Sequence, residues 1–242
     1  MREFTRRKFV QISCAASSLP LIAACGEGSS PASSTAAAMT TRLREEGFRE
    51  TNPQPRRTDY EFNGGLRYDE YPMNVAGPRT FVVQECERVE DAESTELLVL
   101  PRFSLLAWHT SEPLSAEISL RLLLELLIET LGLEPAYMAA VTATDYTEVL
   151  GELERWGIGP EQIFVRDAGV AREAGDGSGY FGPPGYPGPG FPTVSLHYSR
   201  SMHTAGRIRS YPLPGDLVEL GESDVYGGGC GLERVAWASG GS

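Results

Sequence analysis

The spacing of apolar positions along the chain predicts helices in three places. Apolar residues recur every three or four positions over Ser115–Leu131, which predicts the longest helix, capped at Ser115 and ended by Gly132. Shorter helices are predicted over Thr41–Gly47 and Asp145–Trp156. The predicted buried face of the longest helix consists of Ile118, Leu122, Leu126 and Leu127.

Runs of β-branched and aromatic residues predict the strands. Thr80–Gln84 continues through Glu90, and Leu97–Trp108 returns after an acidic loop, so the two form a hairpin with an irregularity or an edge at Pro101. Gly175–Pro192 is predicted to be a loop. Because hairpins and helices do not alternate regularly, the pattern predicts an α+β domain with a mostly antiparallel sheet. The remaining predicted strands are Tyr60–Phe62, Met138–Thr144, Gln162–Arg166, Thr193–Tyr198, Asp216–Leu220 and a glycine-rich strand near the C-terminus.

That last strand, Gly227–Gly231, carries glycine at every second position and is followed by Glu233 and Arg234. Alternate strand residues share a face, so these glycines would leave one face bare and let a flat group lie against the backbone. The guanidinium of Arg234 offers a fork of donors suited to phosphate or carboxylate. A glycine-rich turn before a packing helix explains the pattern equally well, because short glycine motifs often occur by chance.

Length, net charge and hydropathy limit the classes of protein to which the chain can belong. The 242 residues are enough for one substantial domain with appendages, and the formal net charge is −12. An acidic chain lacks the basic face that a large nucleic-acid footprint needs. After the N-terminal stretch, no apolar run has the length of a membrane span, and the mean hydropathy is −0.22.

The N-terminus carries an export pattern. Thr5–Val10 contains a twin arginine, and the apolar stretch that follows ends in Leu21–Gly26, which resembles a lipoprotein lipobox. We therefore expect residues 1–24 to be a signal peptide, residues 25–40 to be a lipidated Cys25 with a flexible linker, and residues 41–242 to be the domain. Lipid on Cys25 would hold the chain at the outer face of the cell membrane or in the periplasm. The alternative is an amphipathic segment with a chance cysteine.

Two cysteines remain in the predicted domain, Cys86 and Cys230. An oxidising exterior would permit a disulfide, but sequence cannot show that the thiols approach each other, so we expect two buried thiols. No cysteine or histidine spacing is typical of a metal site. His109, His197 and His203 are scattered, and we interpret each as a surface or packing residue.

The order of these features resembles a known enzyme family. Arg88-Val89-Glu90 on a strand, followed by a charged loop and a return strand, resembles motif 2 of class II aminoacyl-tRNA synthetases. The stretch from Gly227 to Arg234 resembles their motif 3. Over about residues 41–237 the segments follow the order of the catalytic domain of alanyl-tRNA synthetases. The matching segments include Phe62–Leu66, Gln84–Arg88, Leu131–Pro135 and Gly188–Pro192.

The resemblance implies an antiparallel sheet of six or seven strands flanked by helices, which binds ATP with Mg²⁺ and activates an amino acid as its adenylate. It implies that Arg88 contacts the α-phosphate and the amino-acid carboxylate. Arg88 would thereby offset charge at the reacting phosphorus, and Arg234 would stack on the nucleotide or hold the γ-phosphate. The implied cofactor-binding residues are Glu90 near adenine, Arg102 at the phosphates, Gly229 and Gly231 beneath the adenosine, and Glu219, which with Leu220 matches the family's Glu-Ile.

Departures from the family limit what the resemblance implies. Gly227 and Gly228 stand where the family has an Asp before its motif 3 glycines, and Gly221-Glu222 replaces a Trp-Asn pair. The tRNA-recognition and editing parts have no counterpart, and an acidic domain would repel tRNA phosphates. We therefore expect an exported lipoprotein that binds ATP or an adenylate-like small molecule and not tRNA. The alternatives are a binding lipoprotein that kept the fold and lost the reaction, and a structural surface protein; the oligomeric state is left open.

Overall fold

The structure is a computed structural model that describes residues 31–53, 62–63, 78–88, 94, 97–182 and 190–240. Its helices are α1 (Pro31–Glu45), α2 (Ala116–Leu124), the π-helical continuation of α2 (Glu125–Thr130), α3 (Leu150–Arg155), α4 (Ala168–Ala174) and α5 (Leu232–Ala238). Single 3₁₀ turns occupy Pro135–Tyr137, Thr147–Val149 and Pro160–Gln162. The strands are β1 (Arg49–Glu50), β2 (Phe62–Asn63), β3 (Arg79–Arg88), β4 (Arg102–Thr110), β5 (Met138–Ala143), β6 (Ile163–Arg166), β7 (Tyr180–Phe181), β8 (Phe191–Pro192), β9 (Val194–Tyr198), β10 (Val218–Asp224) and β11 (Gly227–Gly231).

One large sheet organises the described residues. Nine strands form it in the order β1-β3-β4-β11-β10-β9-β5-β6, with β2 paired to β3. Every neighbouring pair from β3 to β5 is antiparallel, whereas β1 with β3 and β5 with β6 are parallel. The predicted α+β class with a mostly antiparallel sheet is confirmed. The count of six or seven strands that the resemblance implies is wrong, because the sheet also includes the two-residue strand β1, which is too short to leave a sequence pattern, and β2, which overlaps the predicted strand Tyr60–Phe62.

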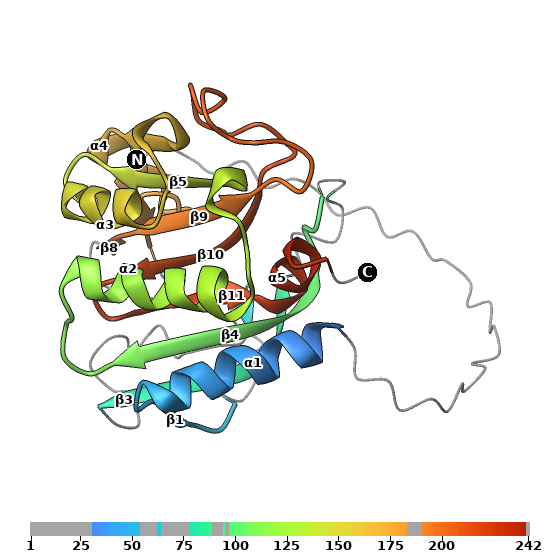
Figure 1. Cartoon of the computed structure of the whole chain (residues 1–242). Coiled ribbons are helices and arrows are strands. Elements are labelled where there is room, and N and C mark those ends of the chain that lie inside the picture. Colours follow the sequence, from blue (N-terminus) through green and yellow to red (C-terminus); the bar gives the residue numbers. More distant parts are fainter. Residues whose placement is uncertain are drawn as a thin grey trace, which may run out of the picture.

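The sheet places the hairpin β3–β4 directly against β11, although more than a hundred residues of chain lie between them. Figure 1 shows α1 crossing the β3–β4 side, α2 crossing the middle of the sheet, and α5 between them, all on one face. These helices cover a continuous apolar core, as expected when a sheet buries one face against helices. Its buried strand residues include Phe81, Leu106, Trp108, Met138, Leu196, Leu220 and Cys230.

The predicted cap and end of the longest helix are confirmed. The side chain of Ser115 accepts a hydrogen bond from the backbone N–H of Ile118, and Gly132 takes a left-handed φ of 70° after the π-helical turn. The predicted face is wrong at Ile118, which is 50% exposed. The buried stripe is centred on Leu120 and Leu123, and at 3.6 residues per turn Ile118 lies far from that centre.

Helix α1 corrects the predicted linker. It begins at Pro31, so residues 31–40 are helix and belong to the folded domain. The run Ala36–Ala38 has high helix propensity, and the segment buries Met39 and Leu43 completely. Small residues such as Ala and Ser are common in linkers as well as in helices, and here the buried side chains decide between the two.

Other boundaries also differ from the prediction. Strand β4 begins at Arg102, immediately after Pro101, and the predicted loop Gly175–Pro192 contains the short pair β7–β8. Helix α4 was not predicted, although Asp167 caps it and Gly175 ends it at a φ of 58°. The expectation of two buried thiols is confirmed, because Cys86 and Cys230 are buried and form no disulfide.

Candidate functional site

The second face of the sheet, opposite α1, α2 and α5, carries polar side chains where β9 and β10 meet. Strand alternation sends Ser195 and His197 to this face. Ser195 is the cross-strand partner of Glu222, and His197 is the partner of Glu219. Glu222 in turn pairs with Gly229 of β11. Directly opposed residues lie within side-chain reach, so these positions form one polar surface, here called the polar face.

Arg234 reaches the polar face from the first turn of α5. Its Nε donates to the carbonyl oxygen of Leu98 at 3.1 Å, and its Nη1 donates to the carbonyl oxygen of Glu219 at 3.3 Å. Nη1 also lies 3.7 Å from the Oε2 of Glu219. The side chain remains 27% exposed. The structure therefore places the motif 3-like arginine beside the predicted cofactor-binding Glu219.

His197 is the buried base of this surface. Burial, and after it the positive charge of Arg234, lower the pKa of His197 from 6.5 to about 3, while the charge of Asp176 acts in the opposite direction. The imidazole is therefore neutral at physiological pH. Its Nε2 lies 3.0 Å from the Oγ of Ser195, which donates to the Oγ of Ser178 at 3.2 Å.

A short segment, Asp176–Gly179, lies across β9 and β10 and is here called the strap. Arg166, which is buried on β6, donates from Nη1 to Asp176 Oδ1 at 2.7 Å and to the carbonyl oxygen of Ser178 at 2.5 Å. The Arg166 guanidinium also stacks on the ring of Tyr211, 4.0 Å from its centroid. Gly177 of the strap has a left-handed φ of 86°, which favours glycine, and a Cβ there would also displace the Glu222 carboxylate, whose Oε2 would lie 2.4 Å away.

The glycines of β11 fall into two groups. A Cβ on Gly227 would lie 2.1 Å from the carbonyl oxygen of Trp108, and a Cβ on Gly228 would lie 2.4 Å from the carbonyl oxygen of Glu222. Both glycines are required by the fold. A Cβ on Gly229 would meet nothing closer than 3.5 Å, and a Cβ on Gly231 would meet only the stem of Arg234 at 3.5 Å. Neither is required by packing, and both are partly exposed.

The resemblance assigned three other residues to the nucleotide site, and the structure does not place any of them beside Arg234. Arg88 ends β3, where the structure describes its backbone and not its side chain, and Glu90 lies outside the described residues. Arg102 is 75% exposed, with Nε and Nη2 each 3.2 Å from Oε1 of Glu87. By alternation along β4, Arg102 shares the helix-covered side with Leu106, so it does not converge with Arg234. Cys25 also lies outside the described residues.

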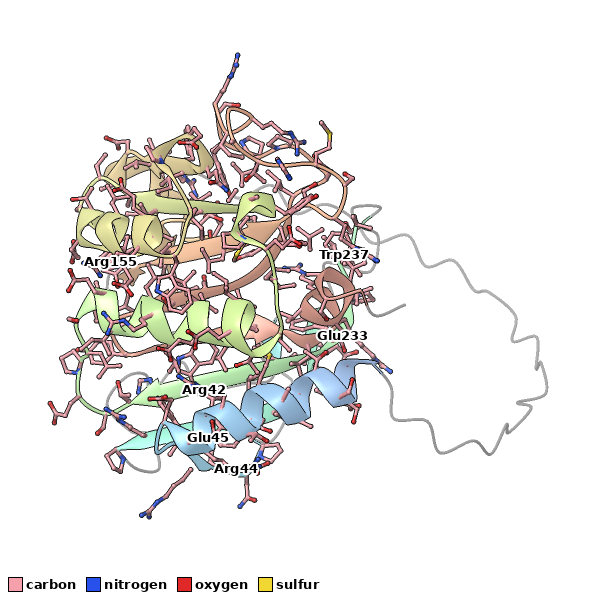
Figure 2. The ribbon with its side chains drawn as sticks, viewed as in Figure 1. Arg42, Arg44, Glu45, Arg155, Glu233 and Trp237 are labelled. Carbon is pink, nitrogen blue, oxygen red and sulfur yellow. The ribbon has the colours of Figure 1, made fainter. Side chains whose placement is uncertain are left out.

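Several residues of the polar face were missed by the sequence reasoning. His197 was interpreted as a scattered surface or packing residue, and Ser178, Ser195 and Glu222 were not assigned any role. The alternation of Val194, Leu196 and Tyr198 with Ser195 and His197 was the signal that could have found them. Glu233, labelled on α5 in Figure 2, has a positioning role. Both of its carboxylate oxygens accept from the backbone N–H of Ser104 at 2.9 Å, which ties α5 to β4.

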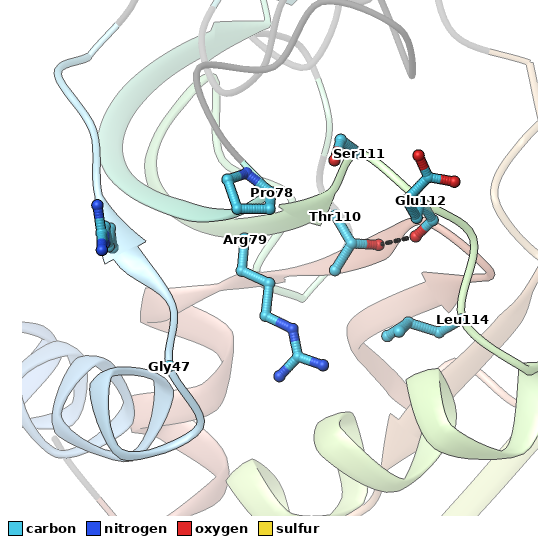
Figure 3. A pocket seen from close by; sticks show the side chains of 8 residues that line it. Gly47, Pro78, Arg79, Thr110, Ser111, Glu112 and Leu114 are labelled. Carbon is cyan, nitrogen blue, oxygen red and sulfur yellow. Dashed lines mark hydrogen bonds between the residues drawn. The ribbon is translucent and has the colours of Figure 1, made fainter.

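A groove of about 420 Å³ lies at the other end of the β3–β4 hairpin, between Gly47, Arg79 and Leu114 (Figure 3). The guanidinium of Arg79 donates to the carbonyl oxygen of Glu46 at 3.0 Å, and the hydroxyl of Thr110 donates to the carbonyl oxygen of Glu112. None of the predicted site residues lines this groove.

The comparisons with known proteins do not show which family the chain belongs to. No family model matches it, and no curated protein matches it. Among solved structures, the apo histidyl-tRNA synthetase of S. aureus is similar, with a TM-score of 0.47 and 12% identity, over 91% of this chain and 70% of that chain.

Within the described ranges, no cluster of three or more His, Cys, Asp or Glu side chains is placed so that it could hold a metal ion. Within the same ranges, no helix is both long enough and apolar enough to cross a membrane. For a nucleotide, the surface beside Arg234 fits in one respect: a Cβ on Gly229 or Gly231 would make only ordinary van der Waals contacts, so packing does not explain why both positions lack a side chain.

Proposed function

We propose that the chain is a class II synthetase-like domain that binds ATP or an aminoacyl-adenylate-like ligand on the polar face, over β11. The observation that carries the proposal is the division of the β11 glycines. Gly229 and Gly231, the two glycines that the resemblance assigns to adenosine, are the two that packing does not require. A glycine that the fold does not need, at a partly exposed strand position, is explained by a ligand that approaches the backbone.

The charges beside these glycines support the proposal. Arg234 presents a partly exposed guanidinium next to Gly231, where a nucleotide phosphate or a carboxylate would form charge-assisted hydrogen bonds. Glu219 holds that guanidinium in place from the neighbouring strand. ATP would bring Mg²⁺ with it, and the carboxylates of Glu219 and Glu222 are the acidic groups of this surface that could face the ion. Arg88 remains the proposed contact for the α-phosphate.

Binding without turnover is the second candidate, and one observation favours it. The family's Asp before the motif 3 glycines corresponds to Gly227 or Gly228, and both positions exclude any side chain because a Cβ would clash with backbone oxygens. The fold therefore has no room for that carboxylate at either position. A chain with this backbone could retain the nucleotide surface and lack amino-acid selection.

The first experiment tests the nucleotide surface. ATP and a non-hydrolysable adenylate analogue should raise the thermal midpoint of the wild-type protein, because a ligand that binds the native state stabilises it. Gly229→Val should fold and lose that rise, since its methyl groups would occupy the space over β11. Gly151→Ala is the matched control, because a Cβ there meets only Arg155 Nη2 at 3.8 Å and lies on α3. An unchanged rise in Gly229→Val would contradict the proposed surface.

The second experiment separates turnover from binding. ATP–pyrophosphate exchange is measured with a panel of amino acids, in wild type and in Arg88→Ala and Arg234→Ala. Exchange that depends on both arginines supports amino-acid activation. Ligand-induced stabilisation without exchange supports the binding protein. If neither stabilisation nor exchange occurs, the domain is a structural surface protein, and both candidates fail.

We also propose that the chain is exported by the twin-arginine route and anchored by lipid on Cys25, from the pattern at residues 5–26. Helix α1 begins at Pro31, which leaves residues 26–30 between the lipid and the domain. Fully extended, that link spans only about 20 Å, so the domain would sit close to the membrane surface. Labelled fatty acid should appear in the wild-type chain and not in Cys25→Ser, and Arg6→Lys with Arg7→Lys should retain the chain in the cytoplasm. Label in Cys25→Ser would contradict the anchor.

A further inference from the structure

The strap, Asp176–Gly179, keeps its place without any apolar side chain of its own. Its sequence is Asp-Gly-Ser-Gly, and Gly177 and Gly179 have left-handed φ values of 86° and 89°. Glycine loses more backbone freedom on folding than any other residue, so a segment of this kind is ordered only where contacts from outside hold it. Those contacts therefore decide how firmly this side of the polar face is fixed.

Arg166, at the end of β6, makes the charged contact to the strap. Its Nη1 donates to Asp176 Oδ1 at 2.7 Å and to the carbonyl oxygen of Ser178 at 2.5 Å, so one guanidinium joins two residues of the strap. The hydroxyl of Tyr211 donates to Asp176 Oδ2 at 3.2 Å, and its ring centroid lies 4.0 Å from the Arg166 guanidinium carbon. Arg166 is only 6% exposed. Burying a paired cation is a poor way to gain stability, which favours a role in fixing the strap.

The strap in turn borders the acidic residues of β10. A Cβ built on Gly177 would lie 2.4 Å from Oε2 of Glu222 and 3.8 Å from Oε1 of Glu219, so the backbone of Gly177 lies beside both carboxylates. The Oε2 of Glu219 lies 3.7 Å from Nη1 of Arg234. Neighbouring groups therefore connect Arg166, through the strap and Glu219, to the guanidinium that the proposed ligand would meet.

We propose that Arg166 is a positioning residue of the ligand surface: it clamps the strap, which fixes the carboxylate of Glu219 and, through it, the guanidinium of Arg234. The inference rests on the proposed function for the nature of the ligand, which brings a phosphate or carboxylate to Arg234. Arg166 is buried, so it acts through the strap and not by contact with the ligand. A guanidinium that a fixed carboxylate already holds in place loses less freedom when it binds an anion, and it binds that anion more tightly.

The first arm of the test follows backbone hydrogen exchange without ligand. Arg166→Gln removes the clamp, so the amides of Gly177 and Ser178, which donate to the Tyr180 carbonyl oxygen and to Asp176 Oδ1, should exchange at least about tenfold faster. Amides of β4 should change only as far as the stability of the whole domain changes. Unchanged exchange in the strap, or equal acceleration in the strap and in β4, overturns the inference.

Two further variants complete this arm. Arg172→Gln is the matched control, because Arg172 also pairs with an aspartate, Asp145, and lies over a tyrosine ring, that of Tyr180. Within the described residues, its side chain makes no hydrogen bond or ion pair to the strap, so exchange in the strap should not change. Tyr211→Phe keeps the ring and loses only the hydroxyl bond to the strap, and it should speed the same amides by about threefold. If Arg166→Gln does not fold, Tyr211→Phe decides the result of this arm.

The second arm measures the affinity for ATP by calorimetry. Arg166→Gln should weaken binding by about five- to tenfold, and Arg172→Gln by less than about twofold. In a Glu219→Gln background, adding Arg166→Gln should change the affinity by less than about twofold, because the proposed connection runs through Glu219. An Arg166→Gln effect of the same size in both backgrounds overturns that connection, since residues that act independently have additive effects. Tyr211→Phe takes the place of Arg166→Gln in the same comparison if the latter does not fold.

The outcomes separate this inference from the proposed function. If the wild type binds ATP and Arg166→Gln binds it equally well although its strap exchanges faster, the positioning role is overturned and the nucleotide surface stands. If the wild type does not bind ATP, both are overturned. Weaker binding that depends on Glu219, together with faster exchange confined to the strap, supports both.

Discussion

The two faces of the sheet differ in what their residues do. The helix-covered face is filled by apolar side chains such as Phe81, Leu106 and Trp108, and its glycine Gly228 leaves room for the Trp108 ring. The polar face carries Ser195, His197 and acidic residues, and Gly229 on it fills no packing role. The same five-residue strand therefore serves packing on one side and leaves backbone accessible on the other. Glycine spacing alone therefore does not reveal which glycine is required by packing.

The largest effect is expected on the helix-covered face. Leu106→Ala should lower the free energy of unfolding by about 3 to 4 kcal/mol, because Leu106 is fully buried and its removal leaves a cavity in the core. Denaturant unfolding followed by circular dichroism measures the change. Val170→Ala, at an exposed position on α4, is the control and should change stability by less than about 0.5 kcal/mol. Equal effects at the two positions would contradict the assignment of the core.

The adjacent glycines give the sharpest comparison of the faces. Gly228→Ala should cost about 2 to 3 kcal/mol, since its Cβ would lie 2.6 Å from Trp108 Cζ2 and closer still to a backbone oxygen. Gly229→Ala should cost less than about 1 kcal/mol, because its Cβ meets ordinary contacts at 3.5 Å. Thermal midpoints of the two variants test this order, and a reversed order would show that the faces have been assigned the wrong way round.

The pH dependence of stability tests the buried histidine. The pKa of His197 is lowered in the folded state to about 3, so the unfolded chain holds more protons between about pH 3 and pH 6.5 and stability rises with pH across that window. This one group should add a slope of up to about 1.4 kcal/mol per pH unit. His197→Gln should flatten that part of the curve, and His203→Gln should not. A slope unaffected by His197→Gln would mean that the imidazole ionises freely in the folded protein.

The smallest effect is expected at Arg102. Its ion pair with Glu87 is exposed, so Arg102→Gln should change the free energy of unfolding by less than about 0.5 kcal/mol. Because Arg102 lies on the helix-covered side, the stabilisation by ATP should also persist in this variant. Loss of that stabilisation would place Arg102 with Arg234 in the ligand site, as the resemblance to class II synthetases implies.

The sequence predicted the parts of the fold whose signal is local. The hairpin β3–β4 followed from its β-branched residues, and the start and end of α2 followed from Ser115 and Gly132. The extent of α1 was not predictable from Ala and Ser alone, because these residues are compatible with both a linker and a helix. Only the burial of Met39 and Leu43 in the core settles that segment as helix.

For the candidate site, the residue types of the glycine strand and of Arg234 were readable in the sequence, and only the resemblance assigned Glu219 to the same site; its contact with Arg234 came from the tertiary structure. Tertiary structure alone decided three points: which glycines the fold requires, which side of the sheet carries Arg102, and that His197 is a buried neutral base. The physical reason is that each depends on a cross-strand neighbour from a distant part of the chain: Trp108 for Gly228, Glu87 for Arg102, and Arg234 for His197. Contacts of that kind leave no periodicity in the sequence.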